Sequence, residues 1–307
     1  MDKKAIQDLA DVLVSSHLDM TAGDPLPDHQ AQRSTDAALP DEQVAVLQAC
    51  RRLGFVEHDA DCVAQAWQRQ TERIGRFDPQ AWPDDAQDFG LRPWPRPDAF
   101  PPCPSQLGLY AVLPDAAWVG RMARAGVPTV QLRYKSDDRA AVMREVQAAV
   151  RAVEGTGALL FINDHWQAAM EAGAYGLHLG QEDLADAPLE RIRASGLRLG
   201  VSTHGYAEMR VADRVSPSYL ALGAVFPTTL KRMVTAPQGT GRLQAYARLM
   251  HQFPLVAIGG IDLEKLPDVM RSGVGSVAVV RAITGADHPE LAAQTFMRSM
   301  ASGSPQK

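Results

Sequence analysis

Eight short apolar runs, separated by amphipathic stretches, constrain most strongly what this chain can fold into. Near-continuous apolar strands that alternate with helices are typical of a parallel sheet covered on both faces. Eight such units in about 190 residues predict a compact α/β fold, the (β/α)8 TIM barrel. An open doubly wound sheet is the alternative, but no GxGxxG motif follows the first run. The runs lie at residues 108–113, 129–133, 159–163, 176–180, 198–202, 219–226, 254–260 and 276–283, and the barrel is placed at 107–302.

The chain before the barrel has a different pattern. Residues 93–104 contain six prolines in twelve positions, which predicts an extended connector, and we place a Pro-rich linker at 93–106. Residues 41–73 carry apolar side chains at helical spacing, so residues 1–92 are predicted to form a small, mainly helical N-terminal region. The polar stretch near residues 21–40 is expected to be partly disordered. No catalytic spacing is found before the barrel, and the role of this region stays open.

Charge and cysteine content narrow the class of protein. Cys50, Cys62 and Cys103 stand far apart without a CxxC pair, which argues against a disulfide framework or a zinc site. With no signal peptide and no membrane-length apolar run, we expect a cytoplasmic protein. The net charge of −5 gives no support for nucleic-acid or membrane partners. Residues 1–104 carry 18 acids and 10 bases, so the remainder is mildly basic and suits small anionic ligands.

Polar side chains gather where the predicted strands end. Active sites of TIM barrels are built at the carboxyl ends of their strands, so these residues predict one shared site. In strand order, they are Gln131, Arg133 and Lys135; Asn163 and Asp164; Gln181 and Asp183; Ser202 and His204; Thr228, Thr229 and Lys231; and Gly259 and Gly260.

The residue types at these ends suit a phosphorylated ligand. Arg133, Lys135 and Lys231 are cations, and charge-assisted donors bind phosphoryl oxygens well. Asp164 and Asp183 follow neighbouring strands, and two carboxylates beside phosphate donors fit Mg²⁺. Two structural alternatives stay open, namely rim ion pairs for Arg133 and Lys135 and a helix N-cap for Asp164.

Two histidines and one loop complete the expected site. His178 is expected to be a hydrogen-bonded residue of the barrel interior, whereas for His204 an interior role and a chemical role are equally open. The segment 227–239 is long for a loop between a strand and a helix and is predicted to be a lid. The glycine pair 259–260 suits a phosphate cradle after the seventh strand.

Six motifs occur together in a characteristic order and spacing, and on them the chain resembles the thiamine phosphate synthase family from Leu107 to about Thr284. The motifs are QLRYK (131–135), FINDHW (161–166), GLHLGQEDL (176–184), LGVSTH (199–204), LALGAVFPT (220–228) and VAIGGI (256–261).

The resemblance implies a transferase that couples 4-amino-2-methyl-5-(diphosphomethyl)pyrimidine with 4-methyl-5-(2-phosphoethyl)thiazole, by Mg²⁺-assisted dissociative substitution, to give thiamine phosphate and diphosphate. It also implies phosphorylated small-molecule substrates and a homo-oligomer. By the same likeness the residues that would hold the diphosphate are Gln131, Arg133, Lys135, Asn163 and Lys231. Asp164 and Asp183 would hold the Mg²⁺, and Ser202 would serve the pyrimidine and the leaving group. The thiazole phosphate would be held by Thr228, Gly260 and the backbone of Val280 and Arg281, with Thr229 as the residue that could supply the donor lost at Leu230. Arg133, Ser202 and Lys231 are the residues expected to be catalytic.

Two departures from the family pattern keep alternatives open. Leu230 stands where a second threonine is usual after the sixth strand, and Arg281 replaces a small hydroxyl residue after the eighth. A thiazole tautomerase on the same barrel would use His204 as acid and base and would not need the diphosphate set. A further alternative is a non-catalytic ligand-binding regulator with the N-terminal region as its output module. The loss of the threonine at Leu230 is the observation that supports it.

Overall fold

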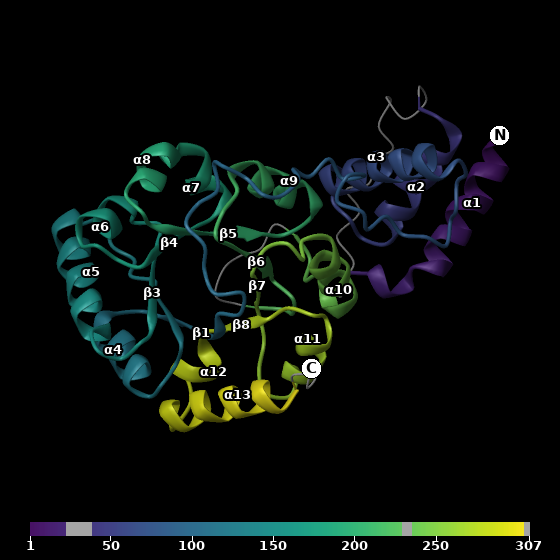
Figure 1. Cartoon of the computed structure of the whole chain (residues 1–307). Helices are drawn as coiled ribbons and strands as arrows, with labels where there is room; N and C mark the ends of the chain where they lie inside the picture. The colour runs from purple at the N-terminus through teal and green to yellow at the C-terminus, as the bar shows by residue number, and fades with distance from the viewer. Residues whose placement is uncertain (23–38, 229–234, 304–307) are drawn as a thin grey trace.

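Eight parallel strands close into a barrel in the computed structural model, which describes residues 1–22, 39–228 and 235–303 (Figure 1). The strands follow one another around the barrel in chain order, and β1 closes it by pairing with β8. This confirms the predicted α/β TIM barrel. The strands are β1 (Gly108–Leu113), β2 (Thr129–Leu132), β3 (Leu159–Asn163), β4 (Gly176–Leu179), β5 (Arg198–Thr203), β6 (Tyr219–Gly223), β7 (Leu255–Ile258) and β8 (Ser276–Val279).

Helices surround the barrel and connect its strands. None of the helices within the described ranges is long and apolar enough to cross a membrane. They are α4 (Ala116–Arg124), α5 (Arg139–Val153), α6 (Trp166–Glu171), α7 (Gln181–Asp186), α8 (Leu189–Ala194), α9 (Tyr206–Val215), α10 (Gly239–Leu249), α11 (Leu266–Arg271), α12 (Arg281–Thr284) and α13 (Pro289–Gly303).

The eighth apolar run is divided between a strand and a helix. We expected one strand over residues 276–283, but β8 ends at Val279 and α12 begins at Arg281. The backbone leaves the extended conformation at Val280, with φ −120° and ψ −84°, and this residue is the N-cap of α12. An apolar run alone does not distinguish a strand from a buried helical turn, because both bury the same side chains.

The barrel interior is filled by large side chains, and glycines on the neighbouring strands make room for them. A Cβ atom at Gly200 would lie 2.1 Å from Cζ of Tyr219, and one at Gly176 would lie 2.4 Å from Cε1 of Phe161. Tyr219 and Phe161 are both fully buried. Close packing of this kind leaves no room for even one methyl group, so both strands need glycine there.

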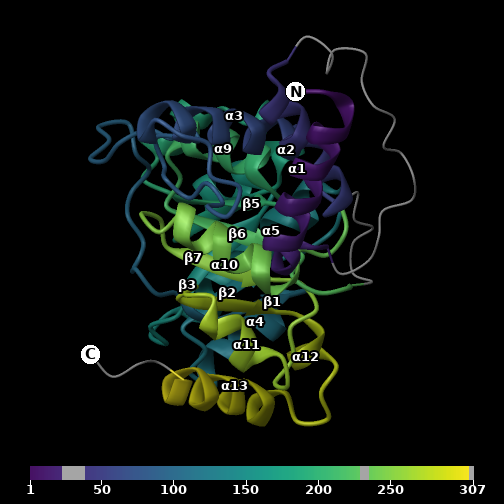
Figure 2. The same ribbon diagram turned by 90° about the vertical axis from the view of Figure 1, so that its right-hand side faces the viewer.

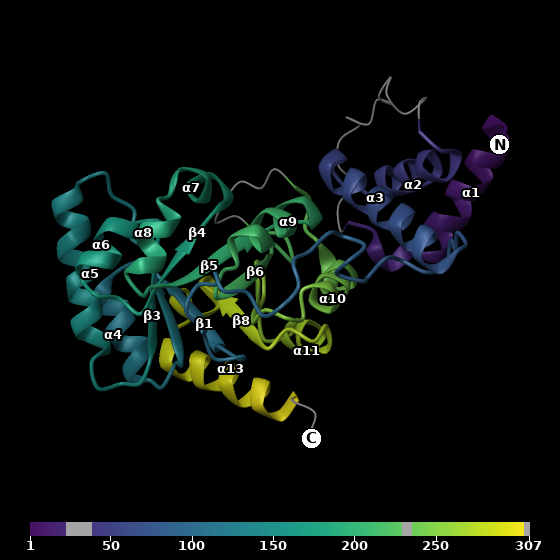
Figure 3. The same ribbon diagram turned by 45° about the horizontal axis from the view of Figure 1, so that its top comes forward.

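A helical N-terminal region packs on one side of the barrel, over α9 and α10 (Figures 1 and 3). Figure 2 shows this region and α13 at opposite ends of the molecule. The expected disorder near residues 21–40 falls mainly on residues 23–38, which lie outside the described part. The region consists of α1 (Lys3–Ser16), the 3-10 helix η1 (Leu18–Met20), α2 (Asp41–Arg52) and α3 (Glu57–Ile74).

Aromatic side chains fill the contact between this region and the barrel. The indole N–H of Trp82 donates a hydrogen bond of 2.9 Å to the hydroxyl of Tyr206 on α9. Phe89 stacks on the same tyrosine ring with centroids 4.7 Å apart. The buried side chains of the region and those between the strands and helices form one continuous apolar cluster. The N-terminal region is therefore packed as part of the same core.

Candidate active site

A chain of hydrogen bonds crosses the barrel interior and ends at the expected site. Gln131 Nε2 donates to Tyr110 Oη at 3.1 Å, and the hydroxyls of Tyr110 and Tyr219 lie 2.8 Å apart. Tyr219 Oη lies 2.7 Å from His178 Nδ1, and His178 Nε2 lies 2.8 Å from Ser202 Oγ. We call these five residues the interior chain. It joins side chains from β2, β1, β6, β4 and β5 and so fixes two expected site residues, Gln131 and Ser202.

The middle of the interior chain is an uncharged imidazole. His178 is buried, and its burial, followed by the positive charge of Arg133, lowers its pKa to about 4. At neutral pH the ring therefore has one N–H, so one ring nitrogen donates and the other accepts. Each of its hydroxyl neighbours can supply the complementary role. The buried, hydrogen-bonded setting is the interior role expected for His178.

Two carboxylates meet at the ends of β3 and β4, as the sequence predicts. Asp164 directly follows β3, and Asp183 lies in the first turn of α7, just after β4. Burial and then the nearby charge of Asp183 raise the pKa of Asp164 to about 6, while the Arg133 guanidinium acts to lower it. Asn163 Nδ2 donates to the Asp164 carboxylate. Asp164, Asp183 and Arg133 therefore lie within electrostatic reach of one another.

Asp164 does not cap the helix that follows it. The N-cap of α6 is His165, and no side chain makes a capping hydrogen bond there. His165 Nε2 instead lies 2.9 Å from the backbone oxygen of Tyr134. Asp164 adopts the left-handed conformation, with φ 63°, and its backbone N–H donates to His178 O at 3.0 Å. This turn directs the carboxylate toward Asn163 and Asp183.

The acid pair suits a hard dication that keeps most of its water. Among the described residues, no group of three or more histidines, cysteines, aspartates and glutamates could hold a metal ion. A transition-metal site would need such a group, whereas Mg²⁺ is commonly held by one or two carboxylates plus water and substrate phosphates. A cation held by Asp164 and Asp183 would also offset their mutual repulsion, which after burial is the next cause that raises the pKa of Asp164. The residues present fit Mg²⁺.

The two cations after β2 differ in their surroundings. Arg133 is half-buried, and its backbone N–H donates to Leu113 O of β1 at 2.8 Å. Lys135 is exposed. Arg133 is thus held near the acid pair, while Lys135 is open to solvent.

The expected thiazole-phosphate residues lie after β6, β7 and β8. Thr228 is half-buried at the end of the described part of its loop. Gly260 has φ 66°, and a Cβ atom there would lie 2.6 Å from Pro227 O, so the glycine turn packs against the loop that carries Thr228. Val280 caps α12, and Arg281 at its start is exposed. Thr229, Leu230 and Lys231, and with them the middle of the expected lid, lie outside the described residues.

The His204 ring is turned toward α9, the helix that follows it. Its Nδ1 lies 2.7 Å from Glu208 Oε2, and its backbone N–H donates to the same oxygen at 2.8 Å. The backbone oxygen of His204 accepts a bond of 2.9 Å from Gln238 Nε2, which also donates to Gly223 O at 2.9 Å. His204 is thereby fixed at the start of α9.

Three residues that take part in these hydrogen bonds were not identified from the sequence. Tyr110 and Tyr219 lie inside apolar runs, so the pattern predicts only that they are core residues. Gln238 lies in a long loop. A usable signal was present, because a buried tyrosine hydroxyl needs a hydrogen-bond partner and both tyrosines lie on predicted inner strands.

Comparison with known proteins gives a consistent picture for the barrel. The family model for thiamine monophosphate synthase matches residues 109–283. The chain is 53% identical over 197 residues to the thiamine-phosphate synthase of Neisseria meningitidis serogroup B, with 64% of this chain and 96% of the relative covered. It is 49% identical over 208 residues to that of Enterobacter sp. strain 638, with 68% and 98% covered. A solved thiamine phosphate pyrophosphorylase from Pyrococcus furiosus is similar in fold, with a TM-score of 0.58, 26% identity, and 64% and 96% of the two chains covered.

Proposed function

Because the chain belongs to the thiamine monophosphate synthase family, we propose that it transfers the aminopyrimidinylmethyl group from its diphosphate to thiazole phosphate. The products are thiamine phosphate and diphosphate. The structural observation that carries the proposal is the meeting of Asp164, Asp183 and Arg133 at the carboxyl ends of adjacent strands. A diphosphate leaving group needs both a dication and fixed cations, and this mouth offers residues for each.

The reaction requires negative charge to grow on the leaving diphosphate. The bond between the pyrimidine methylene carbon and the diphosphate oxygen breaks, and its electron pair leaves with the oxygen. The thiazole nitrogen then donates its lone pair to that carbon. Arg133, Lys135 and Asn163 would bind the diphosphate and stabilise its growing charge by charge-assisted and neutral hydrogen bonds. Asp164 and Asp183 would hold Mg²⁺, which supplies further charge neutralisation when bound.

The interior chain has a positioning role in this proposal. Gln131 and Ser202 stand at its two ends, and neither can rotate freely without breaking a hydrogen bond. A dissociative path needs no protein nucleophile, and no cysteine occurs after Cys103. The neutral His178 ring is a poor proton donor at pH 7, which is consistent with a substitution that needs no general acid at that position.

Product analysis of the full-length protein tests this function. With both substrates and Mg²⁺ we expect thiamine phosphate and diphosphate in equal amounts, and neither product when one substrate is left out. A tautomerase would release no diphosphate, and a ligand-binding regulator would bind the substrates without turnover. Either result would exclude the proposed function.

A pair of variants on one helix tests the metal site. Asp183→Asn is expected to lower turnover at least about a hundredfold and to raise the Mg²⁺ concentration needed for half-maximal rate. Glu182→Gln, an exposed neighbour on α7, is the matched control and should behave as wild type. Equal Mg²⁺ dependence in the wild type and both variants would remove Asp183 from the site.

A further inference from the structure

Helix α9, which follows the Ser202 strand, receives its N-terminal cap from another part of the chain. Its own N-cap residue is Gly205, which has no side chain to accept a hydrogen bond. Asp59 of α3 accepts one instead, from the backbone N–H of Ala207 at 2.8 Å. A Cβ atom at Gly205 would lie 1.9 Å from Asp59 Oδ2, so the carboxylate occupies the space of a local cap. A carboxylate at this end also complements the helix dipole.

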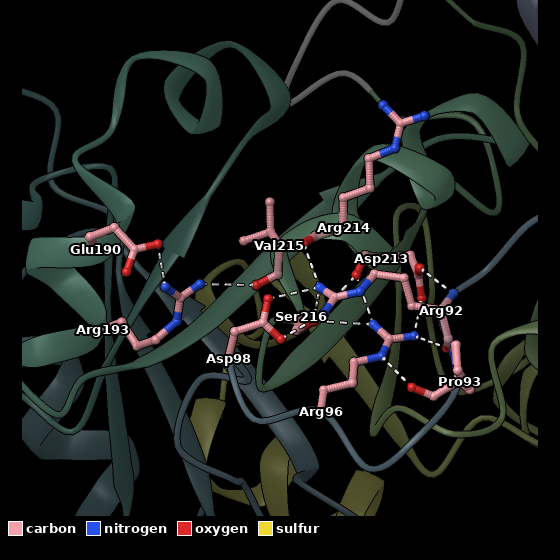
Figure 4. A network of polar contacts seen from close by, with 10 residues as sticks. All are labelled: Arg92, Pro93, Arg96, Asp98, Glu190, Arg193, Asp213, Arg214, Val215 and Ser216. Atoms are coloured by element: carbon pink, nitrogen blue, oxygen red, sulfur yellow. Dashed lines mark hydrogen bonds and ion pairs between the residues drawn. The ribbon is translucent and has the colours of Figure 1, made fainter.

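The other end of α9 is held by the segment just before the barrel (Figure 4). Arg96 Nη1 donates to Asp213 O at 2.7 Å, and its Nη2 forms an ion pair with the Asp213 carboxylate. Both side chains of this pair are only 2% exposed. Arg92 Nη1 donates to Arg214 O at 3.1 Å. Cations and donors at a helix C-terminus satisfy its free carbonyls, so both ends of α9 depend on residues before β1.

The start of α10 is fixed in the same way. Arg242 is buried, and it donates from Nε to Met20 O and from Nη2 to Leu53 O, both at 2.8 Å. Its guanidinium carbon lies 3.6 Å from the ring centre of Phe55. A Cβ atom at Gly241 would lie 1.9 Å from Asp19 O, so the helix backbone packs directly on η1.

These anchors lie close to the proposed site along the chain. Gly205 is three residues after Ser202, and α10 begins directly after the loop that follows β6. Gln238 joins the two places, because its Nε2 donates to both His204 O and Gly223 O. The anchoring segment itself ends before residue 109, where the family match begins.

We propose that residues 1–22 and 39–104, the described part of the chain before the barrel, act as a positioning clamp, which sets where Ser202 and His204 lie relative to Gly223 at the end of β6 by holding α9 at both ends and α10 at its start. Asp59 is a positioning residue in this view, since it acts through the backbone of α9. The expected effect on turnover rests on the proposed function, whereas the effect on the backbone of residues 202–209 does not.

The test compares Asp59→Ala with Asp59→Asn in the full-length protein. Alanine removes the cap, whereas the asparagine amide oxygen can still accept from Ala207 N–H. We expect Asp59→Ala to speed amide hydrogen exchange in residues 202–209 at least about fivefold and to lower kcat at least about fivefold. Asp59→Asn should restore most of both. Asp8→Asn, exposed on α1, is the control and should change neither.

The results of these experiments distinguish a failure of the proposed clamp from a failure of the proposed function. If Asp59→Ala is folded but has wild-type exchange in residues 202–209 and wild-type kcat, the clamp is wrong. If the wild type has no synthase activity, the proposed function fails, and the exchange data alone decide on the clamp. If Asp59→Ala does not fold, Arg92→Met decides in its place. Because Arg92 binds at the C-terminal end of α9, faster exchange across residues 210–216 together with lower kcat supports the clamp, and unchanged values overturn it.

Discussion

His178 Nε2 lies 2.8 Å from Ser202 Oγ, so the serine expected to serve the leaving group is held by a buried imidazole on the adjacent strand. Burial keeps that imidazole neutral, because it lowers the pKa to about 4. The other nitrogen of the ring, Nδ1, lies 2.7 Å from the hydroxyl of Tyr219 on β6, so Tyr219 fixes the orientation of the ring. The position of Ser202 therefore depends on a residue that belongs to the barrel core.

Removing one hydroxyl from the interior chain should affect both stability and turnover. Tyr219→Phe leaves His178 Nδ1 and Tyr110 Oη without a common partner in a fully buried place. We expect a loss of about 1–3 kcal/mol in the free energy of unfolding, measured by urea titration, and a lower kcat. Tyr134→Phe, outside the interior chain, is the control. A folded Tyr219→Phe protein with wild-type stability and kcat would show that the chain does not position Ser202.

The exposed cation after β2 should act on the ligand without supporting the fold. Lys135→Ala is expected to lower kcat/KM for the pyrimidine diphosphate at least about a hundredfold, because a charge-assisted contact to the leaving group is lost. The urea midpoint should be unchanged, since the side chain is exposed. Arg139→Ala at the exposed start of α5 is the matched control. Equal kcat/KM in Lys135→Ala and the control would exclude Lys135 from the site.

The buried cap of α9 should make stability depend on pH in a defined direction. Burial is the main cause that raises the pKa of Asp59 from 3.8 to about 6, against the opposing Ala207 N–H and Arg242 charge. The folded protein then binds this proton more tightly than the unfolded chain. The contribution of Asp59 to the free energy of unfolding therefore falls as pH rises from about 4 to about 6.

Asp59→Asn has no proton to lose and should lack this dependence. Across the same interval the stability of the variant relative to wild type is expected to rise by about 1–3 kcal/mol, as measured by urea unfolding at several pH values. Asp8→Asn should give a curve parallel to wild type. A parallel curve for Asp59→Asn as well would mean that Asp59 is not buried as a charged group.

Removing only one partner of the ion pair between Arg96 in the linker and Asp213 on α9 should strongly lower the free energy of unfolding. Arg96→Met leaves the Asp213 carboxylate buried without its cation, and we expect a loss of about 3–5 kcal/mol. The double variant Arg96→Met with Asp213→Asn should recover part of that loss, because no unpaired charge remains. Arg271→Met breaks an exposed ion pair with Asp268 and should cost far less. Equal losses in the two single variants would contradict the burial of this pair.

The sequence predicted the barrel and much of its mouth because both follow from local patterns. Apolar runs of strand length mark the sheet, and the rule that barrel sites lie at strand carboxyl ends brings Asp164 and Asp183 together. The interior chain was not predicted, because a tyrosine in an apolar run gives no sign of which hydroxyl it will meet across the barrel. The capping of α9 by Asp59 could not be predicted from the sequence for a related reason. It joins residues 148 positions apart, and only tertiary packing places them side by side.

The most direct test of the account is a crystal structure of the full-length protein with thiamine phosphate, diphosphate and Mn²⁺ in place of Mg²⁺, with the metal located by its anomalous signal. We predict one metal ion between the Asp164 and Asp183 carboxylates and a diphosphate within hydrogen-bonding distance of Arg133, Lys135 and Asn163. Metal and diphosphate bound elsewhere, with Asp164 and Asp183 making no contact to either, would contradict the account.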